Sequence, residues 1–163
     1  MSAEKPVIIF VQGSWHRIMH YEQFLRSLRH KGYTVVSPEL PSCSEIVPTN
    51  PAEADIELIT TESQKLVEDG KEVVVIAHSY GGIVMTEAVY GLGIKERSQK
   101  GLQGGIRMLI YNTAFLPLIN VCLEDVANIS LFSWLQYKVS PTISLVLFVI
   151  ISPTFLRVVS HRY

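Results

Sequence analysis

A run of β-branched residues that ends in a serine constrains the fold of this chain more than any other stretch. Residues 72–77 (Glu-Val-Val-Val-Ile-Ala) have the length and the β-branched content of a buried parallel strand. Residues 82–90 follow with apolar side chains at helical spacing, and glycines at positions 91 and 93 end that helix. The chain must therefore turn sharply from a strand into a helix at Ser79.

The residues around Ser79 fit two structural roles. A tight strand-to-helix turn can hold a serine hydroxyl out as a nucleophile, and its closely packed backbone needs small residues two positions before and after the serine. Ala77 and Gly81 occupy these positions, and Gly82 follows. The free N–H groups and the dipole of the new helix would favour negative charge beside the serine. The alternative is an ordinary serine N-cap, and the motif alone leaves both roles open.

Overall composition narrows the classes of function. A chain of 163 residues forms one domain with a substantial core. Its net charge is −1 and its 14 Lys and Arg residues form no patch, which argues against a nucleic-acid partner. Cys43 and Cys122 have neither metal-ligand nor disulfide spacing, so we expect no metal or other cofactor and a reducing compartment. Residues 1–6 show no signal-peptide pattern, and we expect a cytoplasmic protein.

Strands alternate with helices along the first two thirds of the chain. The patterns predict strands at 7–12, 33–37, 72–77 and 107–111, helices at 21–32, 51–70 and 82–90, and an exposed loop at 94–105. This alternation predicts an α/β fold, a three-layer sandwich whose mostly parallel sheet has helices on both faces.

Several segments together resemble the α/β-hydrolase family. Residues 5–16 look like its first core strand and oxyanion loop, and they are most similar to fungal and bacterial members with a Gly-x-Trp-His signature. Three further segments follow in the family's order: Val35–Ser42, Ala77–Gly82 and Leu109–Phe115. The resemblance covers about residues 5–138, which we expect to be the N-terminal part (1–138) of such a domain.

The resemblance implies that Ser79 is the nucleophile of a serine hydrolase, which attacks an ester, amide or thioester carbonyl. The backbone N–H of Tyr80, directly after the nucleophile, would donate to the oxyanion, and the N–H of Ser14 in the first loop would donate a second hydrogen bond. The ring of Tyr80 would form part of the pocket wall rather than act as an acid.

The first loop also carries residues with implied roles. Gly13 would let the loop approach the substrate, and Trp15 and His16 would line or buttress the pocket. For His16 and for His78, packing of the loop and the turn is the structural alternative. This chain has Gln12 where relatives commonly carry histidine, a change that would alter the loop's packing but not its backbone donors.

The rest of a catalytic triad is harder to find. A serine nucleophile needs a histidine to take its proton and an acid to orient that histidine, and in this family the acid and then the histidine follow the serine. Asp125 and His161 stand in that order, but Asp125 falls in a segment that resembles a lid, and no glycine turn or covering helix accompanies His161. A complete domain has roughly 250 residues, so we expect both partners of Ser79 to be missing here.

Composition changes towards the C-terminus, and we place a boundary between residues 138 and 139. All 15 acidic residues precede position 126, whereas residues 139–156 are 18 consecutive uncharged residues. Val139-Ser140 can be encoded by a typical intron start, so residues 139–163 fit a translated intron or an incorrect gene end. Residues 139–156 also reach the minimum length of a membrane span, which would make the protein membrane-associated. A buried strand at 143–151 is the third alternative.

These observations predict a carboxylesterase-type hydrolase that acts on a small apolar or aromatic ester. An inactive hydrolase fragment or pseudoenzyme and lyase chemistry on the same fold are the alternatives, because a fold fixes neither substrate nor bond. Without further strands, the strand near 106–111 would leave an open apolar sheet edge. The sequence indicates no oligomeric state.

Overall fold

The structure is a computed structural model that describes residues 4–116 and 148–151. In chain order its elements are β1 (Val7–Val11), the 3-10 helix η1 (Ile18–Tyr21), α1 (Glu22–His30), β2 (Val35–Val36), the 3-10 helix η2 (Pro41–Cys43), α2 (Pro51–Glu68), β3 (Glu72–His78), α3 (Gly81–Ala88), α4 (Ile94–Gln99), β4 (Gly105–Asn112) and β5 (Phe148–Ile151).

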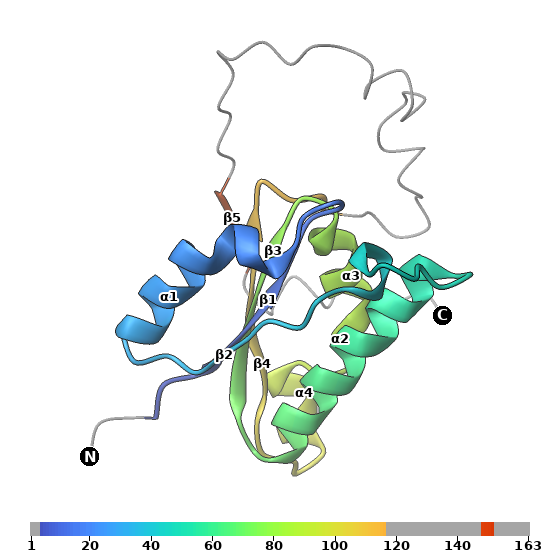
Figure 1. The fold of residues 1–163 in the computed structure, drawn as a ribbon. Helices are drawn as coiled ribbons and strands as arrows, with labels where there is room; N and C mark the ends of the chain where they lie inside the picture. The colour runs from blue at the N-terminus through green and yellow to red at the C-terminus, as the bar shows by residue number, and fades with distance from the viewer. Residues whose placement is uncertain (1–3, 117–147, 152–163) are drawn as a thin grey trace.

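The strands form one sheet in the order β2-β1-β3-β4-β5. The first four are parallel, with Phe10 of β1 opposite Ile76 of β3 and Ile76 opposite Ile110 of β4, and β5 runs antiparallel to β4. Helix α1 lies on one face of the sheet, and α2, α3 and α4 lie on the other (Figure 1). The predicted three-layer α/β fold with a mostly parallel sheet is confirmed.

Alternation along β1 divides the core between the two faces of the sheet. Ile8 and Phe10 pack with Leu25 of α1 on one side. Ile9 and Val11 pack on the other side with residues of α2 and α3, among them Ile59. Every residue of β1 is buried, as expected for a strand that is covered on both faces. This central position fixes the loop that follows β1 relative to the turn that follows β3.

The prediction of an exposed loop at 94–105 is wrong for residues 94–99, which form helix α4. The helix is short and strongly charged, so its sequence has no apolar periodicity to reveal it. A long-range contact holds it in place. The side chain of Arg97 is only 9% exposed and donates to the backbone oxygens of Val67, Gln103 and Gly104. Its guanidinium thereby joins α4 to the end of α2 and to the loop before β4.

The prediction of an open edge at strand 106–111 is also wrong over much of β4, where Leu109–Asn112 pair with β5. Strand β5 lies inside the apolar segment 139–156 and corresponds to the last four residues of the strand alternative at 143–151. Across residues 4–116 and 148–151, no helix has both the length and the apolar character that a membrane span requires. The 138/139 boundary, Cys122, Asp125 and His161 lie outside the described residues.

Candidate active site

Ser79 occupies the turn between β3 and α3, and its backbone is in the left-handed region with φ of 51°. Tyr80 returns to right-handed helical geometry and precedes the first residue of α3. An L-residue with a side chain pays about 1–2 kcal/mol for the left-handed conformation. Such strain persists only where the surrounding structure enforces it, and it is typical of functional sites. The sharp turn that the sequence predicts at Ser79 is therefore present.

The glycines after Ser79 let neighbouring backbone come close to the turn. A Cβ atom on Gly81 would lie 2.6 Å from the carbonyl oxygens of both Val11 and Gln12. A Cβ atom on Gly82 would collide with the carbonyl oxygen of Phe115. Two backbone segments thus pack directly against the start of α3, and a side chain at either glycine would force them apart. Ala77, the small residue before the serine, is fully buried.

The loop after β1 lies against the Ser79 turn. A Cβ atom on Gly13 would be 3.0 Å from the Cβ of Ser79 and 2.8 Å from Nδ1 of His78. The loop turns at Gly13–His16, where the His16 N–H donates to the Gly13 carbonyl oxygen at 3.3 Å and Trp15 has a φ of 60°. Within residues 4–116, no hydrogen bond uses the backbone N–H of Ser14 or of Tyr80. Both donors are therefore without a hydrogen-bond partner in this part of the chain.

Tyr21 connects this loop to the end of β3. Its hydroxyl oxygen accepts a hydrogen bond from the Gly13 N–H at 3.2 Å and lies 2.7 Å from Nδ1 of His78. Burial, and then the nearby His16, lower the pKa of His78 below its ordinary value of 6.5, which favours the neutral ring. A neutral His78 with its proton on Nε2 accepts a hydrogen bond from the Tyr21 hydroxyl at Nδ1. The rings of His16 and His78 meet edge to face, 5.5 Å apart, so both histidines pack among the residues that hold the loop.

Gln12 braces the same loop from inside the protein. Its side chain is fully buried, and its Nε2 donates to the His16 carbonyl oxygen at 2.6 Å and to Oε1 of Glu39 at 2.9 Å. Glu39 also accepts the N–H of Ile18 at 3.2 Å. The Oε1 atom of Gln12 has no partner among the described residues. The side chain of Trp15, in contrast, is 76% exposed at the tip of the loop.

No sequence pattern singles out Asp55, which nevertheless lies next to the site. It is on α2 and fully buried; its Oδ2 accepts the hydroxyl of Tyr80 at 3.1 Å and its Oδ1 accepts the N–H of Ser42 at 2.9 Å. Burial, and then the charge of Asp55, raise the pKa of the Tyr80 phenol far above its ordinary value of 10.0. The phenol therefore remains a hydrogen-bond donor.

The described residues do not bring a base to Ser79. Within residues 4–116, no histidine or carboxylate is hydrogen-bonded to the Ser79 hydroxyl. Asp125 and His161 lie in the part of the chain that the structure does not describe. In the described part, no group of three or more His, Cys, Asp or Glu side chains has the arrangement of a metal site. Residues 4–116 thus show a strained serine, the loop at Gly13 packed against it, and two backbone N–H groups, those of Ser14 and Tyr80, that form no hydrogen bond there.

Solved structures with the same fold share little sequence with this chain. One is an extracellular α/β-hydrolase from a Paenibacillus species, described as a structural and functional homologue of tobacco salicylic acid binding protein 2; it is 20% identical, with a TM-score of 0.54 over 76% of this chain and 49% of that one. Another is tomato methylketone synthase I in complex with 2-tridecanone, 16% identical, with a TM-score of 0.61 over 94% of this chain and 59% of that one.

Curated relatives are more similar in sequence. The α/β hydrolase nvfD of Aspergillus novofumigatus is 36% identical over 110 residues, which are 68% of this chain and 43% of that protein. The probable hydrolase R7 of a Phoma species is 32% identical over 123 residues, 74% of this chain and 47% of that protein. The carbendazim hydrolyzing esterase of a Nocardioides species is 26% identical over 111 residues, 67% of this chain and 42% of that protein. The chain spans less than half the length of these relatives.

A family model described as the alpha/beta hydrolase family matches residues 8–157. The match begins in β1, includes the Ser79 turn and runs beyond β5, so it covers most of the chain. It agrees with the α/β fold of the described residues and with the relatives above. The chain belongs to the alpha/beta hydrolase family.

Proposed function

We propose that this chain carries the nucleophile and the oxyanion donors of a serine hydrolase of the carboxylesterase type. The observation that carries the proposal is the left-handed Ser79 between β3 and α3, with Gly13 of the first loop packed against it. Alpha/beta hydrolases act on small-molecule substrates, and one relative is named as an esterase. A nucleophilic serine at this turn accounts for strain that an N-cap alone does not require.

In this mechanism the Oγ of Ser79 attacks the ester carbonyl carbon, and its proton passes to a base. The N–H groups of Tyr80 and Ser14 donate to the oxygen that becomes negative in the tetrahedral intermediate. Collapse of this intermediate breaks the bond to the alcohol oxygen, which takes a proton as it leaves. Water then hydrolyses the acyl group from Ser79. No base or orienting acid for Ser79 is present among the described residues, and the sequence predicts that this chain lacks both, so the labelling experiment below tests whether the chain reacts by itself.

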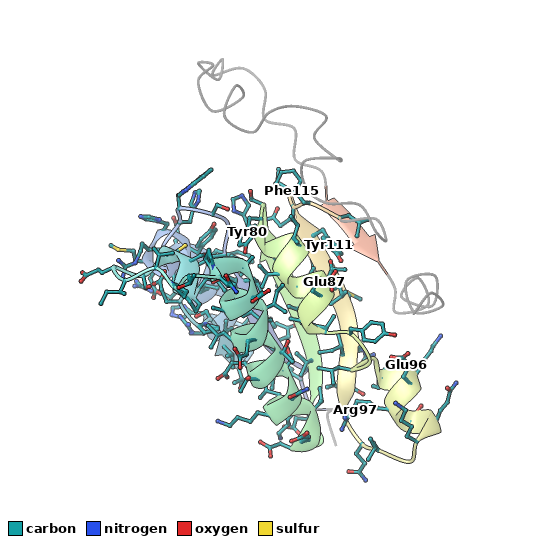
Figure 2. The ribbon with its side chains drawn as sticks, turned by 90° about the vertical axis from the view of Figure 1, so that its right-hand side faces the viewer. Tyr80, Glu87, Glu96, Arg97, Tyr111 and Phe115 are labelled. Carbon is teal, nitrogen blue, oxygen red and sulfur yellow. The ribbon has the colours of Figure 1, made fainter. Side chains whose placement is uncertain are left out.

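Apolar side chains near the turn favour an apolar substrate. Trp15, at the tip of the first loop, is largely exposed, and Phe115 is partly exposed where its backbone meets the Ser79 turn. Figure 2 shows Phe115 and Tyr80 at the same end of the sheet. Burying apolar area against such side chains contributes about 25 cal/mol per Å². Small aryl or alkyl esters are therefore the expected substrates.

A fluorophosphonate probe tests the proposal, because it reacts covalently with activated serines. We expect labelling of the unmodified protein and none of Ser79→Ala. Ser98→Ala is the matched control, since Ser98 lies in α4 at the other end of the sheet, and it should be labelled like the unmodified protein. Failure to label the unmodified protein would support the inactive alternative, and labelling of Ser79→Ala would disprove the assignment of the nucleophile.

A panel of short aryl and alkyl esters then defines the reaction. Turnover that is lost in Ser79→Ala supports the esterase. A protein that reacts with the probe at Ser79 but hydrolyses none of the esters would point to the lyase alternative, which can be assayed with cyanohydrins. The expected cytoplasmic location is a separate prediction, which fractionation of the producing cells tests.

A further inference from the structure

The residue directly after Ser79 is tied to a buried carboxylate on another helix. The Tyr80 hydroxyl donates to Oδ2 of Asp55 at 3.1 Å, and the Ser42 N–H donates to Oδ1 of the same carboxylate at 2.9 Å. Asp55 belongs to α2, and Ser42 lies in η2. One side chain therefore links the turn to two segments that are distant in sequence. This link takes no part in the proposed steps of ester hydrolysis.

Stability alone gives a weak reason for this arrangement. Asp55 is fully buried, and no Lys, Arg or His side chain forms an ion pair with it among the described residues. Burial of a carboxylate is costly unless hydrogen bonds compensate for lost water. Two hydrogen bonds to a charged acceptor offset part of that cost, but a well-packed apolar pair would achieve the same stability. Unlike an apolar pair, the carboxylate forms directional hydrogen bonds, and these fix the position of the Tyr80 hydroxyl.

The geometry concerned is the peptide unit between Ser79 and Tyr80. Its carbonyl oxygen, that of Ser79, accepts the N–H groups of Gly82 and Phe115, each at 3.1 Å. Its N–H belongs to Tyr80 and points to the opposite side, because the peptide is trans and planar. The carbonyl end of this unit is thus held directly. The amide end is held through Tyr80, whose own carbonyl oxygen accepts the Ile83 N–H at 2.9 Å and whose ring ends at Asp55.

We infer that Asp55 is a positioning residue, which orients the Tyr80 N–H towards the oxyanion by anchoring the Tyr80 ring to α2. This inference rests on the proposed function, since it assigns a partner to one of the two oxyanion donors. Asp55 does not touch the reacting atoms. Its effect is to resist relaxation of the strained Ser79 backbone, which would turn the Tyr80 amide away from the substrate.

Two variants that break the same link from opposite sides test this inference. Tyr80→Phe removes the hydroxyl, and Asp55→Leu removes the carboxylate at similar volume. Each should lower the rate constant of fluorophosphonate labelling by about tenfold, and the double variant should be little worse than either single one, because both changes remove the hydrogen bond between Tyr80 and Asp55. For ester turnover, kcat should fall and KM should change little.

Asparagine at position 55 serves as the rescue. Its Oδ1 can accept the Ser42 N–H while its Nδ2 donates to the Tyr80 oxygen, so the anchor is kept without the charge. We expect Asp55→Asn to label within about threefold of the unmodified protein. Tyr111→Phe is the matched control for loss of a buried phenol, since the Tyr111 hydroxyl lies 2.7 Å from that of Thr86 and has no bond to the Ser79–Tyr80 peptide. It should label at the unmodified rate.

A spectroscopic measurement reports on the amide without activity. In protein labelled with ¹⁵N-tyrosine, the Tyr80 amide peak is the one that disappears in Tyr80→Phe. It should move or broaden in Asp55→Leu and return in Asp55→Asn, while the Tyr111 peak stays in place. Such results support the inference.

Unchanged labelling and an unmoved Tyr80 peak in Asp55→Leu would overturn the inference but leave the proposed function intact. An unlabelled parent protein would overturn the proposed function, and the Tyr80 peak would then decide by itself whether Asp55 orients the amide.

Discussion

Gly13 lies so close to Ser79 that no side chain fits between them: a Cβ atom on Gly13 would be 3.0 Å from that of Ser79. This contact joins the loop after β1 to the turn after β3. It also holds the loop that contains Ser14 beside Ser79, at the carboxyl ends of β1 and β3. Changes at Gly13 should therefore affect both reactivity and stability.

Gly13→Ala should lower the fluorophosphonate labelling rate by at least about tenfold, because the methyl group pushes the loop and its oxyanion donor away from Ser79. The cost in stability should be about 1–3 kcal/mol, typical of a crowded position. Labelling kinetics and thermal melting measure the two effects. Gly93→Ala is the matched control: its new Cβ would meet only Glu96, at an ordinary 3.5 Å. A Gly13→Ala protein that labels like Gly93→Ala would contradict this account of the loop.

Relief of strain at Ser79 should be measurable. Ser79→Ala keeps a Cβ in the left-handed conformation, whereas Ser79→Gly removes it. We expect the glycine variant to be more stable than the alanine variant by about 1 kcal/mol, as judged from urea unfolding. Both variants lack the hydroxyl, so the difference reports on the backbone. Equal stability of the two would mean that the turn stores no strain at this residue.

Acid should weaken the protein through His78. Burial, and then His16, lower its pKa in the folded state, so as pH falls below 6.5 the unfolded chain binds a proton before the folded one does. The contribution of His78 to the unfolding free energy is then fully present above pH 6.5. It is lost as the pH falls from 6.5 to the lower pKa of His78 in the folded protein. His78→Asn keeps an acceptor for the Tyr21 hydroxyl but does not titrate, so its unfolding free energy should fall less between pH 7.5 and pH 5.

His78→Phe separates the two roles of this side chain. It abolishes both the titration and the acceptor, so it should be less stable than His78→Asn at pH 7.5 and equally insensitive to acid. An undiminished acid dependence in both variants would assign the effect to groups other than His78.

Arg97 should be far more important to stability than its place in a short charged helix indicates. Arg97→Met leaves three backbone oxygens without their donor, and we expect a loss of about 2–4 kcal/mol. Arg107→Met is the matched control, because Arg107 is exposed and its one ion pair among the described residues is with Glu72, a type of contact worth about 0–1 kcal/mol. Chemical unfolding compares them. Similar losses in the two variants would show that the buried contacts contribute nothing special.

The sequence predicted those parts of the fold whose signals are local. Strand β3 and helix α2 are evident from a β-branched run and from an Asn-Pro start, and their observed bounds differ from the predicted ones by a residue or two. Helix α4 has no such signal, since Arg97 holds it through contacts with α2 and with the loop before β4. The prediction failed where long-range contacts replace periodicity.

The candidate site divides in the same way. Ser79 and the small residues beside it form a contiguous motif, and the structure shows the turn that this motif predicts. Asp55 lies 25 positions from Tyr80 in the sequence, and only the packing of α2 against the sheet brings the two together. Tyr21 falls at the start of the helix predicted at 21–32, and its position in the sequence indicates no other role. The 3-10 turn η1 instead aims its hydroxyl at Gly13.

The left-handed residues of this fold are divided between the two ends of its sheet. After the carboxyl ends of β1, β3 and β4 they are Trp15, Ser79 and Thr113, which all carry side chains. Before β2 and β3, at the amino ends, Gly32 and Gly70 take the same conformation without steric cost. Selection for thermal stability alone would replace the first three residues by glycine. A directed-evolution experiment that selects for stability alone should therefore substitute these three residues first. Those that are kept when activity is selected as well would be the residues that substrate conversion requires.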